Sequence, residues 1–399
     1  MIVRVHAVWL TVCVASASTA LAAPRHAHGL SAPAAQDVRA ATKPAESSLQ
    51  AGWDQLNGGH FAAAAAAFRR VVELKPDLAA GHLGLGLSLA GQQRYDEAIA
   101  CFERAIALGP DSAAAHMNLG LAYVRVDNKP SALAAFEQAA RISPRDPRTH
   151  LQVGLALERF GRHAEAIASC RRALALQADD ADAHYCVGWA SSGLERWADA
   201  IDAFAHVIAV RRDDVNAHVG IGIASASLGQ YARSIDAFAA ALALDPNLVA
   251  ARLALGSIYG NLERWDDAIE NLQRAVALDP SNRDAHYSLA KALARKGRHE
   301  DALEQCRQMV RFALADSDAH LRMGLTLIDL HRPAEAVNAL SEAVRLRPGF
   351  GAAMFNLALA YQALGRTRDA WDVQRALADI DANLSAQLEL LLGKERGSP

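Results

Sequence analysis

Residues 79–146 decide the fold, because they contain one 34-residue pattern written twice. Residues 79–112 read AAGHLGLGLSLAGQQRYDEAIACFERAIALGPDS, and residues 113–146 read AAAHMNLGLAYVRVDNKPSALAAFEQAARISPRD. When each row is numbered from column 1 to column 34, both rows place His, Leu-Gly, Ala, Phe and Pro in the same columns. A period of this length predicts a repeat protein rather than the two or three domains expected from chain length alone.

The same period extends in both directions, from Ala45 to Leu384, with no insertion or deletion. Column 8 is Gly or Ala, column 20 is Ala or Ser, column 24 is mostly Phe or Leu, and column 32 is often Pro. The ten rows are residues 45–78, 79–112, 113–146, 147–180, 181–214, 215–248, 249–282, 283–316, 317–350 and 351–384.

Each row predicts two amphipathic helices. Columns 4, 7, 8 and 11 recur at helical spacing, as do columns 20, 24, 27 and 28, so the helices should cover about columns 2 to 14 and 18 to 30. Glycine at column 15 in five rows should end the first helix, and proline at column 32 cannot continue the second. Small residues at columns 8 and 20 should let the two helices approach closely.

This pattern resembles the tetratricopeptide repeat (TPR) family, whose signature has the same spacing of Leu-Gly, Ala, Phe and Pro. The resemblance implies an all-α, right-handed superhelical solenoid of about ten helix-turn-helix repeats. Residues 385–399 follow the last row. Their leucines, Leu388, Leu390, Leu391 and Leu392, predict a C-terminal capping helix and tail.

The N-terminus predicts a secretory signal over residues 1–22. Arg4 supplies the positive start, residues 7–15 are largely apolar, and Ala20-Leu21-Ala22 is a small-x-small cleavage site. An uncleaved anchor is the alternative, although the apolar run is short for a membrane span. Residues 23–44 should be a flexible linker. We therefore expect an exported protein, periplasmic or secreted, with no membrane insertion after cleavage.

The resemblance implies that the first helix of each row lines a concave groove, with columns 2, 5, 6, 9, 12 and 13 facing inward. Here columns 5 and 9 are strongly apolar, and large apolar surfaces usually mark binding sites. Partial burial of column 5 between neighbouring helices is the alternative. The predicted partner-binding residues are Leu49, Trp53, Leu83, Leu87, Met117, Leu121, Leu151, Leu155, Tyr185, Trp189, Val219 and Ile223.

Histidines and cysteines recur at repeat positions, where packing is their simplest role. Seven of the fifteen histidines occupy column 4. Equivalent side chains of adjacent rows should stay roughly 8–10 Å apart, too far to share a zinc ion that needs each nitrogen within about 2.1 Å. Cys170 and Cys186 lie on helices that should pack together, so a disulfide between them is left open, since sequence does not give their separation.

No catalytic constellation stands out from the repeat background. The net charge is −3 with acids and bases interspersed, which does not favour nucleic-acid binding. We therefore expect no enzyme and no cofactor. The predicted function is a scaffold or adaptor that binds a peptide or amphipathic helix of a protein partner in the groove. A regulatory or assembly subunit of an envelope glycosyltransferase or polysaccharide-export machine is the alternative. The partner and the oligomeric state are not predicted.

Overall fold

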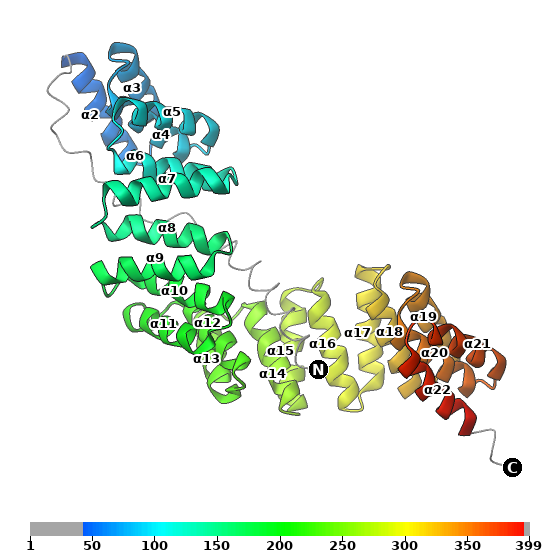
Figure 1. The fold of residues 1–399 in the computed structure, drawn as a ribbon. Coiled ribbons are helices and arrows are strands. Elements are labelled where there is room, and N and C mark those ends of the chain that lie inside the picture. The colour runs from blue at the N-terminus through cyan, green and yellow to red at the C-terminus, as the bar shows by residue number, and fades with distance from the viewer. Residues whose placement is uncertain (1–42, 395–399) are drawn as a thin grey trace. The chain divides into compact units, whose positions relative to one another are not determined.

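The computed structural model describes residues 43–394, and all regular secondary structure in that range is helical (Figure 1). The predicted signal, nearly all of the predicted linker and the last five residues of the tail lie outside the described residues. The all-α prediction is confirmed, with two helices in every row. No helix within residues 43–394 combines the length and apolar character needed to cross a membrane.

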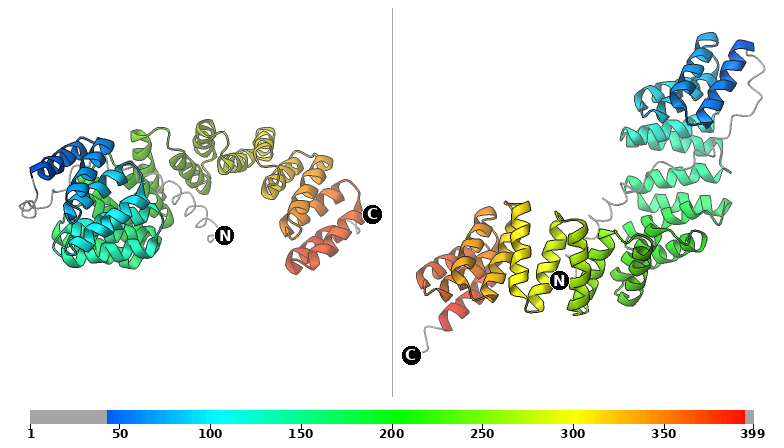
Figure 2. Two further views of the ribbon diagram at one scale, coloured as in Figure 1. Left: turned by 90° about the horizontal axis from the view of Figure 1, so that it is seen from above. Right: turned by 180° about the vertical axis from the view of Figure 1, so that it is seen from behind.

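The chain divides into two compact units, residues 1–230 and residues 231–399. In the first unit the helices are α2 (Lys43–Asn57), α3 (Phe61–Leu74), α4 (Ala79–Gly91), α5 (Tyr95–Leu108), α6 (Ala113–Arg125), α7 (Lys129–Ile142), α8 (Pro147–Arg159), α9 (His163–Leu176), α10 (Ala181–Gly193), α11 (Trp197–Val210) and α12 (Val215–Ser227). Within this unit, from α2 to α12, each helix packs on the next one along the chain (Figure 2).

The second unit begins inside the sixth row. Its helices are α13 (Tyr231–Leu244), α14 (Val249–Asn261), α15 (Trp265–Leu278), α16 (Arg283–Arg295), α17 (His299–Phe312), α18 (Ser317–Asp329), α19 (Pro333–Leu346), α20 (Gly351–Ala363), α21 (Thr367–Ala378) and α22 (Ala382–Lys394). Complete first helices cover columns 1 to 13 and second helices mostly columns 17 to 30, each beginning one residue earlier than the periodicity predicts.

The turn inside each row is set by one backbone conformation at column 15. Five rows have glycine there, with φ between 71° and 76°. The other five rows reach φ of 55–62° with Gln93, Asp127, Glu195, Glu263 and His331. A left-handed residue at this point terminates the first helix and frees the chain to reverse. Glycine at column 15 predicts the turn in half of the rows, whereas the 34-residue period predicts a turn at column 15 in every row.

In rows that have phenylalanine at column 24, glycine at column 8 makes room for the ring, whereas in row 4 Gly154 also lies close to the backbone of the second helix. A Cβ added to Gly86, Gly120 or Gly188 would lie 2.6 Å from the column-24 phenylalanine of the same row. Rows 8 and 10, which have alanine at column 8, have Cys306 and Gln374 at column 24 instead of an aromatic ring. The two columns therefore fill one shared volume, and a larger residue in one accompanies a smaller or more flexible residue in the other.

The last helix covers the end of the second unit, with two of its five leucines buried. α22 packs on α20 and α21. Leu388 and Leu392 are buried there, and the Gln374 amide donates to Ser385 Oγ at 3.0 Å. Leu390 and Leu391 are exposed. The capping helix predicted from the leucines is present, and it begins three residues before the end of the tenth row.

Candidate partner-binding surface

The column-5 side chains lie mostly in the packing between helices. Leu49, Leu83 and Leu151 are only 5–7% exposed, and Met117, Tyr185 and Val219 are half-buried. Leu49 and Leu83 share a core cluster with Phe68, and Leu151 packs in the cluster that holds Cys170. Column 5 therefore contributes chiefly to the contacts between helices, and it presents little surface.

The column-9 side chains are more open, and they form a stripe along the first helices of unit 1. We call Trp53, Leu87, Leu121, Leu155 and Trp189 the column-9 stripe. Leu121 is 41% exposed and the other four are half-buried, whereas Ile223 of the next row is buried. Each of the five residues comes from a successive row and occupies the same helical position.

The two tryptophans of the stripe are held by the phenylalanine at column 24 of their own row. The Trp53 ring meets the Phe68 ring edge to face at 5.1 Å between centroids, and Trp189 meets Phe204 in the same way at 5.2 Å. Tyr185 packs within 6.0 Å of both Trp189 and Phe204. Because these contacts fix one side of each indole, the rings are ordered before any partner arrives.

A carboxyl that the sequence did not single out acts on Tyr185, the neighbour of Trp189. Burial raises the pKa of Glu158, which follows Leu155 by three residues on α8, and its charge is felt at Tyr185 on α10. Burial also raises the pKa of Tyr185 to about 12, against an opposing effect of Trp189. Glu158 is in column 12, which the resemblance places on the concave face, so its column was the available signal.

The histidines of column 4 hold the turns between rows. In all seven, Nε2 lies 2.8–3.2 Å from the carbonyl oxygen of the column-32 residue six positions earlier, to which the ring N–H donates. Arg252, in the same column, reaches the Pro246 carbonyl at 3.4 Å. Within residues 43–394, no group of three or more His, Cys, Asp or Glu side chains is placed to bind a metal ion.

Cys170 and Cys186 form a disulfide between α9 and α10, with their Cα atoms 6.4 Å apart. This contact joins column 24 of one row to column 6 of the next. The same two columns meet as Phe68 with Gly84 and as Phe204 with Gly220, where an added Cβ would lie 2.3 Å and 2.5 Å from the ring. The disulfide thus fills the space that a ring fills in other rows. Cys101 and Cys306 are free.

A family model described as a tetratricopeptide repeat matches residues 49–113, 83–147, 117–183, 188–248, 253–319 and 321–385. The chain belongs to the tetratricopeptide repeat family. TPR proteins are in general non-catalytic scaffolds for protein–protein interaction, which is consistent with a surface of repeated apolar positions. The family resemblance predicted from the columns is therefore confirmed.

One of the solved structures that resemble the chain supports the TPR fold at a TM-score above 0.5. The C-terminal part of a TPR repeat-containing protein from Cytophaga hutchinsonii is 14% identical, with a TM-score of 0.52, and the match covers 60% of this chain and 99% of that one. MamA from Desulfovibrio magneticus RS-1 is 24% identical over 43% of this chain and 96% of that one, with a TM-score of 0.41. PilW, a type IV pilus biogenesis factor, is 20% identical over 53% and 98%, with a TM-score of 0.48. No curated protein sequence matches the chain.

Proposed function

We propose that this TPR protein is a non-catalytic scaffold that binds a peptide or amphipathic helix of a partner protein along the column-9 stripe. The observation that carries the proposal is the partial exposure of five large apolar side chains from five successive rows. An amphipathic helix presents apolar residues at regular spacing, so it can match such a series. Because column 5 is mostly buried, column 9 should supply most of the contact.

Binding should depend on burial of the stripe more than on charge. A buried large apolar side chain contributes about 1.5–3 kcal/mol, whereas an exposed ion pair contributes about 0–1 kcal/mol. Asp182 is already paired with Arg211 at 2.6 Å, and the hydrogen bond that Arg211 donates to the Asp182 carboxylate raises the pKa of Arg211. Because its charge is engaged within the protein, Asp182 offers little to a partner.

A crosslinking pull-down from the envelope fraction would identify the partner, and titration calorimetry would then compare variants. Trp189→Ala and Leu155→Ser should each weaken binding by about tenfold or more, as for buried interface anchors. Trp197→Ala, a half-buried tryptophan on the second helix of the same row, is the matched control and should bind as the wild type does. Binding should also change little between low and high salt.

If the complex dissociates at high salt and survives Trp189→Ala, the stripe is not the binding surface. In that case the scaffold assignment stands, and the partner would be bound elsewhere on the fold.

We further propose that the protein is exported. The charged start, the apolar run and Ala20-Leu21-Ala22 support a cleaved signal. The Cys170–Cys186 disulfide supports an oxidising compartment, because cytosolic thiols are usually kept reduced. N-terminal sequencing of the mature protein should begin at Ala23 or next to it. A protein that begins at Met1 in the soluble cytoplasm would exclude export.

A further inference from the structure

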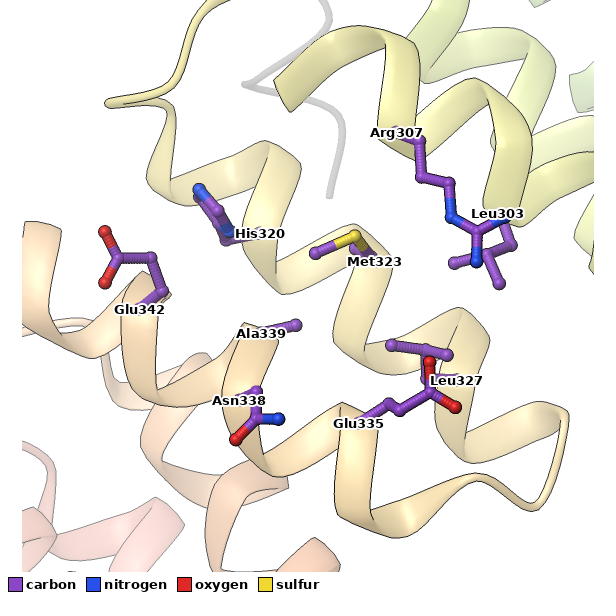
Figure 3. Close-up of a pocket in the computed structure, with 9 residues that line it drawn as sticks. All are labelled: Leu303, Arg307, His320, Met323, Leu327, Glu335, Asn338, Ala339 and Glu342. Carbon is purple, nitrogen blue, oxygen red and sulfur yellow. The ribbon is translucent and has the colours of Figure 1, made fainter. Parts of the chain in front are cut away.

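A pocket of about 290 Å³ lies in the second unit among α17, α18 and α19 (Figure 3). Leu303 and Arg307 come from α17, His320, Met323 and Leu327 from α18, and Glu335, Asn338, Ala339 and Glu342 from α19. The pocket is slightly smaller than a typical drug-sized site, which suits a single side chain. It is separate from the column-9 stripe, which belongs to unit 1.

His320 gives this pocket a polar group that the protein leaves without a partner. The side chain is only 8% exposed. Its Nε2 lies 3.1 Å from the Leu314 carbonyl oxygen, to which it donates, and its Nδ1 has neither a hydrogen-bond partner nor solvent contact. Because the ring proton is on Nε2, Nδ1 of the neutral ring is an acceptor. A buried acceptor without a donor is unfavourable, and most are satisfied in folded proteins.

The preceding row shows why this nitrogen lacks a partner. His286 occupies the same column and donates from Nε2 to the Pro280 carbonyl in the same way, and its Nδ1 lies 2.9 Å from Gln305 Oε1. A half-turn of the amide exchanges its oxygen and nitrogen, and because Nδ1 accepts, the amide nitrogen is the atom that pairs with it. Gln305 is in column 23, and the residue of that column in the next row is Ala339. Alanine is too short to reach His320. The change from glutamine to alanine therefore both vacates space and leaves Nδ1 without a donor.

The other walls of the pocket favour an apolar ring that carries a hydrogen-bond donor. Leu303, Leu327, Met323 and Ala339 are apolar, and the Met323 thioether suits contact with an aromatic ring. Arg307, Asn338 and the carboxylates of Glu335 and Glu342 complete the lining. Glu335 is paired with Arg332 and Glu342 with Arg345, so neither carboxylate is free to pair with a ligand. An indole has the required combination, since it is large, flat and apolar, and its ring nitrogen donates without accepting.

We propose that this pocket binds the indole side chain of a tryptophan residue from another polypeptide, with the indole N–H donating to His320 Nδ1. The donor would take the place that the Gln305 amide has in the preceding row. Tryptophan is also the residue type most enriched among the anchors that dominate protein interfaces. The site is independent of the column-9 stripe, so either surface can fail its test without affecting the other.

The test uses methyl NMR on the full chain labelled at the methionine methyl groups. The chain has only five methionines, Met1, Met117, Met309, Met323 and Met354, so few signals need assignment. N-acetyl-tryptophanamide should shift the Met323 methyl signal through the ring current, in a saturable way, while Met117 of unit 1 stays unchanged. Its 1-methylindole analogue, which lacks the N–H, should bind about fivefold more weakly or worse.

Ala339→Gln should abolish the Met323 shift, because the new amide would occupy the space and pair with His320. Ala135→Gln is the matched change, since it lies in the same column of row 3, and should leave the shift unaltered. The comparison of the two ligands tests the same contact in the wild-type protein, without reliance on either variant folding. No saturable Met323 shift, or equal affinity for the methylated analogue, would overturn the proposal.

Discussion

At the scale of single residues, one position in a column often does the same task in many rows. The column-4 histidines and Arg252 all reach the carbonyl of column 32, although imidazole and guanidinium differ in shape and charge. Both side chains place an N–H donor within hydrogen-bond distance of that carbonyl. The carbonyl needs such a donor because it follows the end of a helix and has no partner within the helix. The sequence predicted packing for these histidines. It did not predict the hydrogen bond, because only the turn geometry brings residues six apart together.

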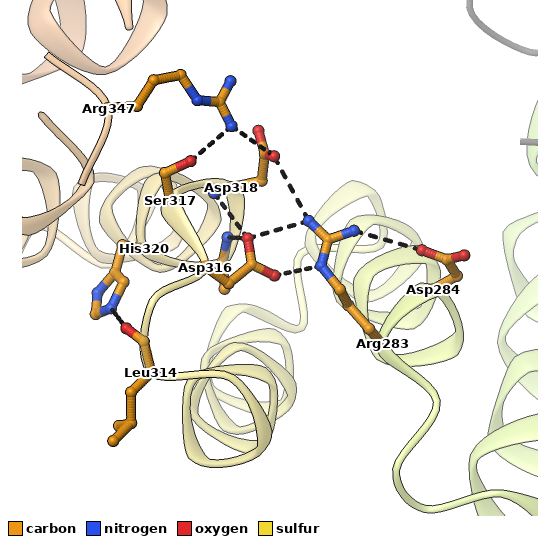
Figure 4. Close-up of polar contacts among 9 residues, drawn as sticks. Arg283, Asp284, Leu314, Asp316, Ser317, Asp318, His320 and Arg347 are labelled. Atoms are coloured by element: carbon orange, nitrogen blue, oxygen red, sulfur yellow. Dashed lines mark hydrogen bonds and ion pairs between the residues drawn. The ribbon is translucent and has the colours of Figure 1, made fainter. Parts of the chain in front are cut away.

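Asp316 combines two such tasks, as Figure 4 shows. Its carboxylate caps α18 by accepting from the backbone N–H groups of Asp318 and Ala319, at 2.9 Å and 3.1 Å. It also forms an ion pair with Arg283, the first residue of α16. Arg347, which directly follows the last residue of α19, adds a contact to Asp318 at 2.8 Å. The first turn of α18 is therefore tied to both neighbouring parts of unit 2.

The pKa of Asp316 predicts how acid affects this contact. Burial alone would raise that pKa, but the Arg283 hydrogen bond and charge and the backbone N–H groups hold it below its ordinary value. A carboxyl whose pKa is lower in the folded than in the unfolded protein stabilises the fold. This stabilisation is complete above the unfolded pKa of about 3.9, and it is lost as the pH falls through the folded pKa. Asp316→Asn keeps the cap but loses the ion pair. Urea titrations should show wild type more stable at pH 7, with the difference shrinking below about pH 4.

Asp214→Asn, at the N-cap of α12, is the matched control, since Asp214 also accepts from a backbone N–H. This variant removes an N-cap charge that is not paired with Arg283, so it separates the effect of that ion pair from the effect of the cap. A difference between wild type and Asp316→Asn that is constant from pH 7 to pH 3 would contradict the role assigned to Asp316.

At the scale of helices, the packing follows a volume rule between columns. Column 24 of one row meets column 8 of the same row and column 6 of the next, so the combined volume of the three side chains matters more than the volume of any one of them. Row 8 illustrates this rule. Cys306 and Ala290 both depart from the usual pattern, and both are fully buried, because the smaller sulfur side chain accompanies the larger column-8 residue.

The disulfide should be replaceable by the pair that other rows use. Under reducing conditions, Cys170→Phe alone should destabilise the protein, because the new ring meets the Cys186 side chain. Cys186→Gly alone should also destabilise, through a void and the glycine cost of about 1 kcal/mol. The double variant recreates the Phe68–Gly84 pair. Its free energy of unfolding should therefore be higher than the two single changes together predict, by roughly 0.5–3 kcal/mol. Urea unfolding of all four proteins measures this coupling.

If the changes in unfolding free energy of the two single variants simply add up to that of the double variant, columns 24 and 6 are not coupled. Non-reducing peptide mapping should meanwhile connect Cys170 to Cys186 and leave Cys101 and Cys306 open to alkylation after unfolding.

The helices and their order could be predicted almost completely from the sequence, because ten rows report the same columns. The contacts that individual side chains make could not be predicted in the same way. Leu49 and Trp53 are one turn apart on one helix and look alike as apolar residues, yet Leu49 is buried and Trp53 is half-buried. The difference depends on the neighbouring row, whose distance and rotation are tertiary properties. The pocket beside His320 is likewise invisible until columns 4 and 23 are known to meet.

At the scale of the whole molecule, the rows differ in how well their ends are covered. Column 30 closes each second helix. It is most exposed where column 32 lacks proline, at 45% for Leu176, 53% for Val210 and 53% for Phe312. In rows with the proline, no described column-30 residue exceeds the 40% of Leu244. The loss of proline therefore accompanies a less protected junction between rows, and in row 8 Leu314 at column 32 is itself 74% exposed.

Hydrogen exchange should therefore be fastest, among the helix ends of the repeats, in residues 205–215 and 305–316. Row 4 lacks the proline as well, but its second helix is tied to the next row by the Cys170–Cys186 bond. Local opening follows the least buried and least tethered segments. Exchange mass spectrometry can compare these segments with the equivalent ends in rows 2 and 3. Equal protection from hydrogen exchange in these two segments and in the equivalent helix ends of rows 2 and 3 would contradict the prediction.

The unbroken 34-residue register also bears on how such a gene can change. Because each column-24 side chain meets the same two columns in every row, recombination that removes one whole row, such as residues 79–112, would bring Phe68 against Asn118, again column 24 against column 6. Loss of a number of residues that is not a multiple of 34 would leave one row incomplete, so that its columns no longer meet those of the neighbouring rows. Whole rows are therefore the units in which the array can be lengthened or shortened without damage to a row, and each such event adds or removes one position of the column-9 series.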